Sequence, residues 1–275
     1  MNDAEFYSTA TTFLISLAYT QPRILAMFIA IPIFNKQIIP GLIRFSIAAG
    51  LGALAAPMLV PVVQVTDFGV MQILMLIVKE AFVGFVMGYV MAIPFWAFEA
   101  VGFLIDNQRG ASIAATLNPL TGNDSSPLGI LFNQAFIVFF FISGGFLLML
   151  GVLYDSFQLW DVFTFYPHLR PETMPLLLEQ MNRILRIALL LGSPIIVAMF
   201  LAEIGLALIS RFVPQLQVFF LAMPIKSAIA MLVLMLYTGT LFEYGYGYIK
   251  ELEFVAPLLN GQWGHFGGVA PGVLR

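Results

Sequence analysis

Residues 76–88 read LIVKEAFVGFVMG, an apolar run that holds Lys79 and Glu80 next to each other. A charge at the centre of a bilayer costs at least about 2.5–3.5 kcal/mol on insertion scales, and a proline removes a helix hydrogen bond. Other strongly hydrophobic runs contain the charged residues Arg23, Arg44, Glu99, Glu203 and Lys226 and the prolines Pro22, Pro32, Pro57, Pro94, Pro194 and Pro224. We therefore predict helices that pack against other protein or line a polar path.

The composition of the whole chain is typical of an integral membrane protein. Of the 275 residues, 60% are hydrophobic and 10% are charged, and the mean hydropathy is +0.95. Because soluble domains carry about 25% charged residues, we predict an all-α integral membrane protein with kinked, broken helices and helical hairpins. The net charge of -3 gives no sign of nucleic-acid binding, and 0 cysteines exclude disulfides and thiolate chemistry.

Six apolar regions are long enough to cross a membrane, which takes about 20 residues. They are Thr12–Phe34, Ile38–Val63, Phe68–Ile105, Leu128–Tyr154, Ile184–Ile209 and Val218–Phe242. The third is too long for one straight span, so it tilts, breaks near Pro94 or forms two helices. We predict one membrane-embedded domain over residues 1–260 and a mobile, Gly-rich tail over residues 261–275.

Two further local patterns predict structure. The pair Gly84 and Gly88 has the four-residue spacing that lets membrane helices approach closely, and we favour packing within the chain over a subunit interface. The polar stretch 155–183 ends in a helical pattern, with Pro175 suited to its first turn.

The segment GFLIDNQRG, residues 102–110, directly follows an apolar run. Glu99, Gly102 and Asp106 share one helical face by their spacing, and Asp106 is placed to pair with Arg109. Residues 111–119 then read ASIAATLNP, which is uncharged and rich in small side chains. Such a segment suits a confined space in which it can move.

A second informative segment is SRFVPQLQVF, residues 210–219, which leads into Met-Pro-Ile-Lys at residues 223–226. Pro214 restricts Val213 to extended conformations, which favours a break between two helices. Lys226 needs a carboxylate, a carbonyl group or water as partner, or it snorkels to the membrane interface.

At these two segments the chain resembles the T subunit of the bacterial type III secretion export apparatus, whose flagellar counterpart is FliR. The first motif is carried by Gly102, Phe103, Asp106, Gln108 and Gly110, followed by Ala114 and Pro119. The second is carried by Pro214, Gln215, Val218, Phe219, Pro224 and Lys226. Arg23 with Pro32, and Glu80 with Gly84 and Gly88, fit the same pattern, and the resemblance covers about residues 10–255.

The resemblance implies a non-enzymatic gate subunit in a helical, hetero-oligomeric, closed-pore assembly of the bacterial inner membrane. In such a subunit we expect the buried charges to pair across subunits and so to fix the register of the helices. The implied partners are the sister R and S subunits, the autocleaving switch subunit U, membrane lipid and secreted unfolded polypeptides. The implied plug of the pore consists of Gly110, Ala111, Ser112, Ile113, Ala114, Ala115, Thr116, Leu117, Asn118 and Pro119. Candidates for assembly or buried charge are Arg23, Arg44, Lys79, Glu80, Glu99, Asp106, Gln108, Glu203, Arg211, Pro214, Gln215, Pro224 and Lys226. Overall similarity favours the virulence branch over the flagellar one.

Two other functions fit parts of the sequence. A secondary transporter would use Glu99 and Asp106 as proton-coupling carboxylates, but we find no two-fold repeat of hydropathy. An intramembrane enzyme would need His168 or His265, and neither histidine has a partner at metal-ligand spacing. We expect no catalytic residue, no metal and no cofactor.

Overall fold

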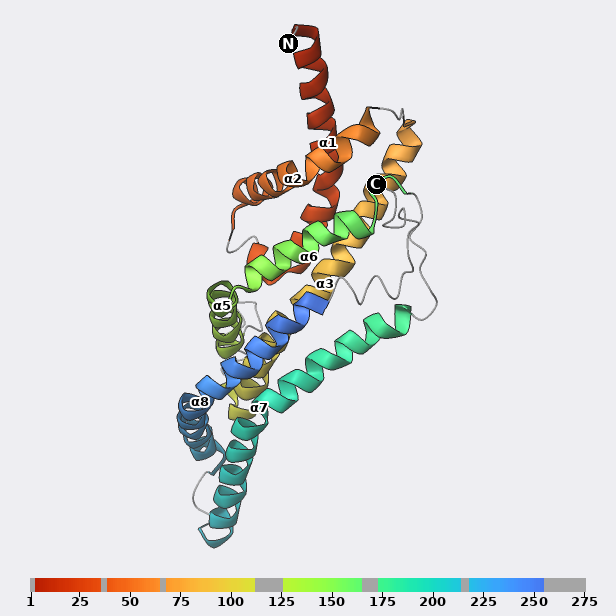
Figure 1. Ribbon diagram of the computed structural model, residues 1–275. Coiled ribbons are helices and arrows are strands. Elements are labelled where there is room, and N and C mark those ends of the chain that lie inside the picture. Colours follow the sequence, from red (N-terminus) through yellow and green to blue (C-terminus); the bar gives the residue numbers. More distant parts are fainter. Residues whose placement is uncertain are drawn as a thin grey trace, which may run out of the picture. The chain divides into compact units, whose positions relative to one another are not determined.

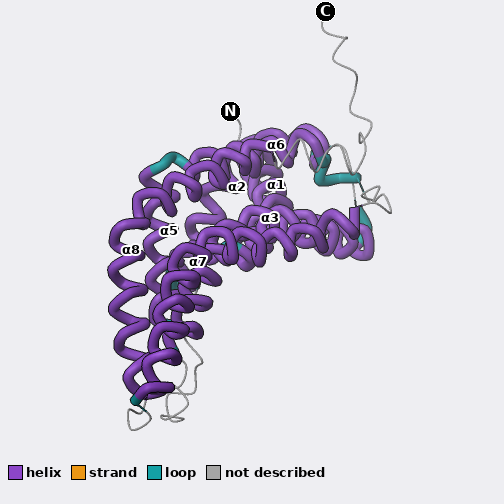
Figure 2. Tube along the Cα trace, turned by 90° about the horizontal axis from the view of Figure 1, so that it is seen from below, coloured by secondary structure: helices purple, strands orange, loops and turns teal. Residues whose placement is uncertain are grey.

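The computed structural model describes residues 3–35, 39–64, 68–111, 126–164, 173–213 and 218–254. Within these ranges every regular element is a helix, which confirms the all-α prediction (Figures 1 and 2). The elements are α1 (Asp3–Ala30), η1 (Pro32–Phe34), α2 (Gly41–Val63), α3 (Val70–Arg109), α5 (Pro127–Ile142), α6 (Gly145–Leu159), α7 (Thr173–Phe212), α8 (Val218–Glu251) and η3 (Leu252–Phe254).

In this part of the chain, five helices are long and apolar enough to cross a membrane: α1, α2, α3, α7 and α8. The broken pair of α5 and α6 makes a sixth candidate span. The prediction of about six apolar segments is therefore confirmed. A chain with this many candidate spans is a multi-pass membrane protein.

The third apolar region forms one continuous helix, although it contains Pro94. Helix α3 has 40 residues, which at 1.5 Å per residue is about 60 Å, or roughly twice the hydrocarbon thickness. Helix α7 also has 40 residues, because it joins the fifth apolar region to the preceding polar stretch. It begins at Thr173, so Pro175 lies in its first turn as predicted.

The fourth apolar region, Leu128–Tyr154, forms two helices rather than one straight helix, in agreement with the predicted broken helices. Helices α5 and α6 meet at a break bent by 76°. Gly144 in this break has a φ of +81°, a backbone conformation that side-chain-bearing residues rarely adopt. Ser143 closes the end of α5, since its backbone N–H donates to the carbonyl of Phe139 at 2.8 Å.

The chain divides into two compact units. The first unit comprises Met1–Ala92, Phe146–Leu177 and Glu251–Arg275, and the second comprises Ile93–Gly145 and Leu178–Lys250. Helix α3 contributes its first half to one unit and its second half to the other. One membrane-embedded domain over residues 1–260 stays a prediction, and the tail 261–275 lies outside the described residues.

In the first unit, α1 and α3 approach closely where α3 has no side chain. A Cβ atom added at Gly88 would lie 2.6 Å from the carbonyl oxygen of Met27, and one at Gly84 would overlap the backbone of Arg23. These glycines therefore serve packing within the chain, as we favoured from their spacing.

In the second unit, the core is built from phenylalanine side chains of α3 and α5. Phe95, Phe98, Phe136 and Phe140 are almost completely buried. The rings of Phe98 and Phe136 stack at 4.2 Å between centroids. A Cβ atom at Gly245 of α8 would lie 2.7 Å from the Phe98 ring, so this glycine lets α8 close the core.

Candidate assembly and gating sites

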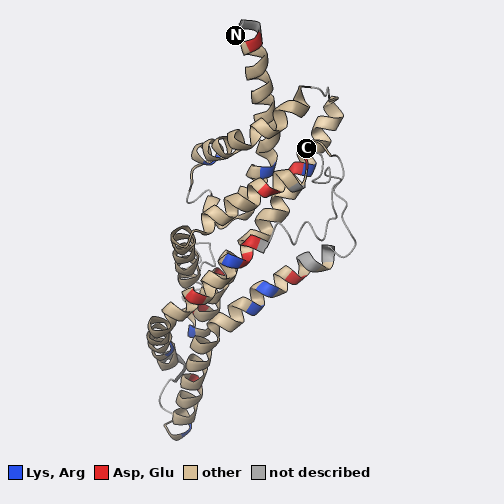
Figure 3. Ribbon diagram, in the orientation of Figure 1, with Lys and Arg blue, Asp and Glu red and all other residues tan. Residues whose placement is uncertain are grey.

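Charged side chains are sparse along the described helices (Figure 3), and three of them form a buried cluster in the first unit. Arg23 of α1 is fully buried, and Glu80 of α3 is 1% exposed. Arg23 Nε donates to Glu80 Oε2 at 2.7 Å, and Nη2 donates to Oε1 at 2.8 Å. This two-pronged geometry is the strongest way for a guanidinium to bind a carboxylate, and it fixes α1 against α3.

The remaining donors of Arg23 bind the C-terminal end of α6. Nη1 donates to the carbonyl oxygen of Ser156 at 2.7 Å and to its hydroxyl at 3.1 Å, and Nη2 donates to the carbonyl of Trp160 at 2.9 Å. The guanidinium carbon also lies 4.4 Å from the ring centroid of Phe157. All five donors that an arginine possesses are thus used.

Lys79 completes the cluster from the same turn of α3. Its Nζ atom lies 2.6 Å from Glu80 Oε1 and donates to the carbonyls of Asp161 and Val162 at 2.8 and 2.9 Å. Two cations and one carboxylate leave one net positive charge. The carbonyl dipoles at and after the end of α6 offset it, because a helix C-terminus carries partial negative charge.

The cluster corrects one prediction. We expected these charges to pair across subunits, but Arg23, Lys79 and Glu80 satisfy each other and the end of α6 within one chain. Arg44 also has a partner within the chain, since its Nη1 atom donates to the carbonyl of Phe34 at 3.4 Å. The physical reason is that α6 returns to α1 and α3 with its free C-terminal carbonyls directed at the two cations.

Asp106 in the last turn of α3 links the end of this helix to the start of α5. It accepts hydrogen bonds from Arg109 Nε at 2.7 Å, the Ser126 hydroxyl at 2.5 Å and the Leu128 backbone N–H at 2.9 Å. Ser126 is itself the N-cap of α5, because its hydroxyl accepts from the N–H of Gly129. The predicted pairing of Asp106 with Arg109 is confirmed, and the second role of Asp106 was missed.

Glu99, Gly102 and Asp106 lie on one face of α3 that packs against α5, as their spacing predicts. A Cβ atom at Gly102 would lie 2.5 Å from the backbone of Leu128 and Gly129. This close approach brings the two backbones together between the carboxylates of Glu99 and Asp106.

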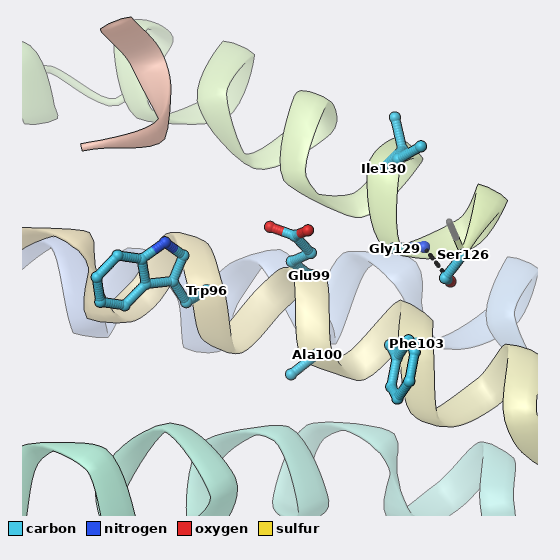
Figure 4. Close-up of a pocket in the computed structure, with 7 residues that line it drawn as sticks. All are labelled: Trp96, Glu99, Ala100, Phe103, Ser126, Gly129 and Ile130. Carbon is cyan, nitrogen blue, oxygen red and sulfur yellow. Dashed lines mark hydrogen bonds between the residues drawn. The ribbon is translucent and has the colours of Figure 1, made fainter. Parts of the chain in front are cut away.

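A pocket of about 570 Å³ opens where α3 and α5 separate (Figure 4). Among its lining residues are Trp96, Glu99 and Phe103 from α3 and Ser126, Gly129 and Ile130 from α5. The half-buried carboxylate of Glu99 points from α3 toward α5. Its Oε2 atom accepts a hydrogen bond from Asn133 Nδ2 at 2.9 Å.

A further charge pair lies between α7 and α8. Lys226 Nζ is 3.2 Å from Glu203 Oε2, so the lysine has the carboxylate partner that we considered for it. The Glu203 side chain is 48% exposed, whereas that of Lys226 is 11% exposed. Pro224 lies within α8, and Arg211 lies in the last turn of α7.

Most of the predicted plug lies outside the described residues, which end at Ala111 and resume at Ser126. Gly110 follows α3 with a φ of +85°, and a Cβ atom there would lie 3.5 Å from Met223. Pro214 and Gln215 are also outside the described residues, but the predicted helix break is confirmed because α7 ends at Phe212 and α8 begins at Val218. Gln108 lies near the end of α3.

Metal binding finds no support in the part of the chain that the structure describes. No group of three or more His, Cys, Asp or Glu side chains there is arranged to hold an ion. Both histidines, His168 and His265, lie outside that part.

Comparison with known proteins gives matches over most of the chain. Residues 14–252 match the family described as bacterial export proteins, family 1. The chain is 45% identical over 226 residues to Yop proteins translocation protein T of Yersinia pestis, covering 80% of this chain and 85% of that protein. It is 33% identical over 219 residues to surface presentation of antigens protein SpaR of Salmonella typhimurium, covering 78% and 80%. It is 28% identical over 224 residues to flagellar biosynthetic protein FliR of Bacillus subtilis, covering 80% and 85%.

Proposed function

The chain belongs to the bacterial export proteins, family 1, and on this basis we propose that it is a structural and gating subunit of the type III secretion export gate. In this role it helps to form and plug the pore that passes unfolded proteins across the bacterial inner membrane. The greater identity to translocation protein T of Yersinia pestis than to FliR of Bacillus subtilis supports the virulence branch.

The observation that carries the gating role is the double anchorage made by Asp106. This carboxylate binds Arg109 at the end of α3 and both Ser126 and Leu128 at the start of α5. The connection that contains Gly110–Pro119 therefore starts and ends at one fixed point. A segment whose two ends are held together in this way is suited to move into and out of a narrow pore, because the helices at its ends can stay in place.

Residue chemistry supports the same assignment. Residues 111–119 contain no charged side chain, and a constriction that passes varied polypeptides works best without strong binding sites. The saturated hydrogen bonding of Asp106 argues against its use as a proton relay, since the carboxylate would have to release Ser126 and Leu128 on each cycle.

The proposed partners are the sister R and S subunits and the switch subunit U. Exposed apolar side chains support assembly within a membrane. On α8, Met235 is 84% exposed and Leu236 is 79% exposed in the isolated chain. Lipid or neighbouring subunits would have to cover such side chains, since together they form a large apolar surface.

The plug assignment is tested by adding charge to the segment. We expect Ala114→Asp and Ala115→Asp to raise ion leakage through the closed gate or to block secretion, because a charge disturbs an apolar constriction. Secretion of exported proteins and membrane conductance are the measurements. Asn123→Asp is the matched control, because it adds the same charge to the same connection outside Gly110–Pro119 and is expected to change neither. Unchanged secretion and unchanged leakage in both alanine variants would refute the plug.

A further inference from the structure

The pocket between α3 and α5 contains a carboxylate that the described chain does not neutralise. We propose that this pocket binds an arginine or lysine side chain of a neighbouring export-gate subunit, with Glu99 as its counter-ion. The inference rests on the proposed function, and it adds a specific docking point to it.

Glu99 differs from the other carboxylates of the described α3. Glu80 and Asp106 each contact a cation at 2.7 Å or less. Glu99 has a hydrogen bond from the neutral amide of Asn133, and no cation of the described residues lies within ion-pair distance of it. The partner amide is also incompletely satisfied, since Asn133 Oδ1 is buried without a hydrogen bond. A half-buried carboxylate with one neutral hydrogen-bond donor destabilises an apolar protein unless a positive charge binds it.

The described residues around the pocket offer no cation for this role. Arg109 is the closest basic residue in sequence, and Asp106 already binds it. Residues 112–125, which connect α3 to α5, contain no lysine or arginine. In the second unit, Lys226 binds Glu203, and Lys250 lies over the ring of Tyr246 at 4.6 Å. The other basic residues of this unit, Arg183, Arg186 and Arg211, lie on α7, whereas the Glu99 carboxylate points toward α5. A cation for Glu99 is therefore best supplied by another polypeptide.

The walls of the pocket suit the stem of a long basic side chain. Trp96 and Phe103 lie three residues before and four residues after Glu99, and both aromatic side chains line the pocket together with the carboxylate (Figure 4). Aromatic faces attract guanidinium and ammonium groups, and they also cover the aliphatic stem. The rim is open to a partner, because Phe103 is 48% exposed and Ile130 is 46% exposed.

A fixed subunit fits this pocket better than a passing substrate. The carboxylate is held by Asn133 and lies beside the close contact of Gly102 with α5, so the site is preorganised. A preorganised charged pocket gives tight and specific binding, which favours assembly. The same property would retain a secreted polypeptide and slow its passage.

The test uses the chain co-expressed with the sister R and S subunits and purified from membranes through a tag on the chain. We expect Glu99→Gln to lower the amount of co-purified sister subunit on the order of tenfold or more, since losing one partner of a buried charge pair weakens binding strongly. Glu243→Gln is the matched control, because it removes an exposed carboxylate of α8, and it should leave the yield unchanged. The chain purified alone should be at least as thermally stable for Glu99→Gln as for wild type, because glutamine keeps an acceptor for Asn133 and removes a charge that lacks a counter-ion.

A photo-crosslinking amino acid at Ile130 identifies the occupant of the pocket. We expect crosslinks to a sister-subunit peptide that contains an arginine or lysine, and we expect replacement of that residue by alanine to reproduce the Glu99→Gln defect. Crosslinks confined to a secreted polypeptide or to lipid would overturn the proposal. Full co-purification of Glu99→Gln would also overturn it and leave the proposed function intact. If even the wild-type chain retains neither sister subunit, the proposed function fails as well.

Discussion

Two embedded carboxylates, Glu80 in the first unit and Glu99 in the second, are satisfied differently. In the first unit, Arg23, Lys79 and Glu80 bind one another and the carbonyls that end α6, and each donor of Arg23 has an acceptor. In the second unit, Glu99 has a single hydrogen bond from Asn133 and borders an open pocket. The contrast separates charges that hold one chain together from a charge that is available to another chain.

This contrast changes how embedded charges should be interpreted in such proteins. A charge in an apolar helix needs a polar or oppositely charged partner, and that partner can be a side chain, a helix end or a neighbouring subunit. In the first unit, the free backbone carbonyls at a helix end accept hydrogen bonds from the buried cations, so no additional acidic side chain is needed. A charge that has no oppositely charged partner within its own chain is then the better indicator of a subunit interface.

The largest effect is expected from Glu80→Ala. This substitution leaves Arg23 and Lys79 buried beside each other without their carboxylate, and breaking a buried ion pair costs about 3–5 kcal/mol. The free energy of unfolding in detergent, obtained from denaturant titration of the purified chain, is the measurement. A loss below about 1 kcal/mol would show that the cluster is solvated or neutralised by another subunit, and the contrast between Glu80 and Glu99 would disappear.

Close helix contacts should be similarly important in both units. We expect Gly88→Ala and Gly102→Ala each to cost about 1–3 kcal/mol, because the new methyl group meets backbone atoms that cannot move without separating two helices. Gly50→Ala in α2 is the control, since no atom lies within 4 Å of the added Cβ. It should be neutral or stabilising by up to about 1 kcal/mol. Thermal denaturation of the three variants compares them directly, and a stable Gly102→Ala would mean that α3 and α5 pack less tightly than described.

Local spacing allowed much of this architecture to be predicted. Three- and four-residue intervals identified the face of Glu99, Gly102 and Asp106, and Pro214 indicated the boundary between α7 and α8. The break at Gly144 could not be found from hydropathy, because the run from Ala135 to Leu153 on either side of it contains no polar residue other than Ser143.

Partners distant in sequence were beyond such reasoning. Arg23 binds the backbone of Ser156, 133 residues away, and a backbone carbonyl has no signature in the sequence. The cap of α5 was different, because Ser126 followed by Pro127 is a common helix start. That pattern is a signal from which the start of α5 could have been placed, although we did not use it, and it does not reveal that Asp106 binds the same turn.

Asp106→Asn is expected to have an intermediate effect. It removes the charge that binds Arg109 and weakens the hydrogen bonds to Ser126 and Leu128, at a cost of about 1–2 kcal/mol. It should also raise ion leakage, since the connection between α3 and α5 loses its common anchor. Conductance and the free energy of unfolding, measured on the same variant, test both effects.

Ser126→Ala removes the N-cap of α5 and keeps the pair of Asp106 with Arg109, so it should reproduce part of each effect. Lost proton coupling with unchanged leakage would favour the transporter alternative.

The smallest effect is expected where a charge pair is exposed. Glu203→Gln weakens the contact with Lys226, but the Glu203 side chain is 48% exposed, and surface ion pairs contribute about 0–1 kcal/mol. The free energy of unfolding of the isolated chain should therefore change little. Lys226→Met should have an equally small effect, because methionine keeps the apolar packing of the lysine stem without its charge. The informative comparison is with the assembled gate. If Glu203→Gln destabilised the complex as strongly as Glu99→Gln while leaving the chain alone unaffected, this pair would also belong to an interface. Internal pairing would then no longer distinguish structural charges from docking charges.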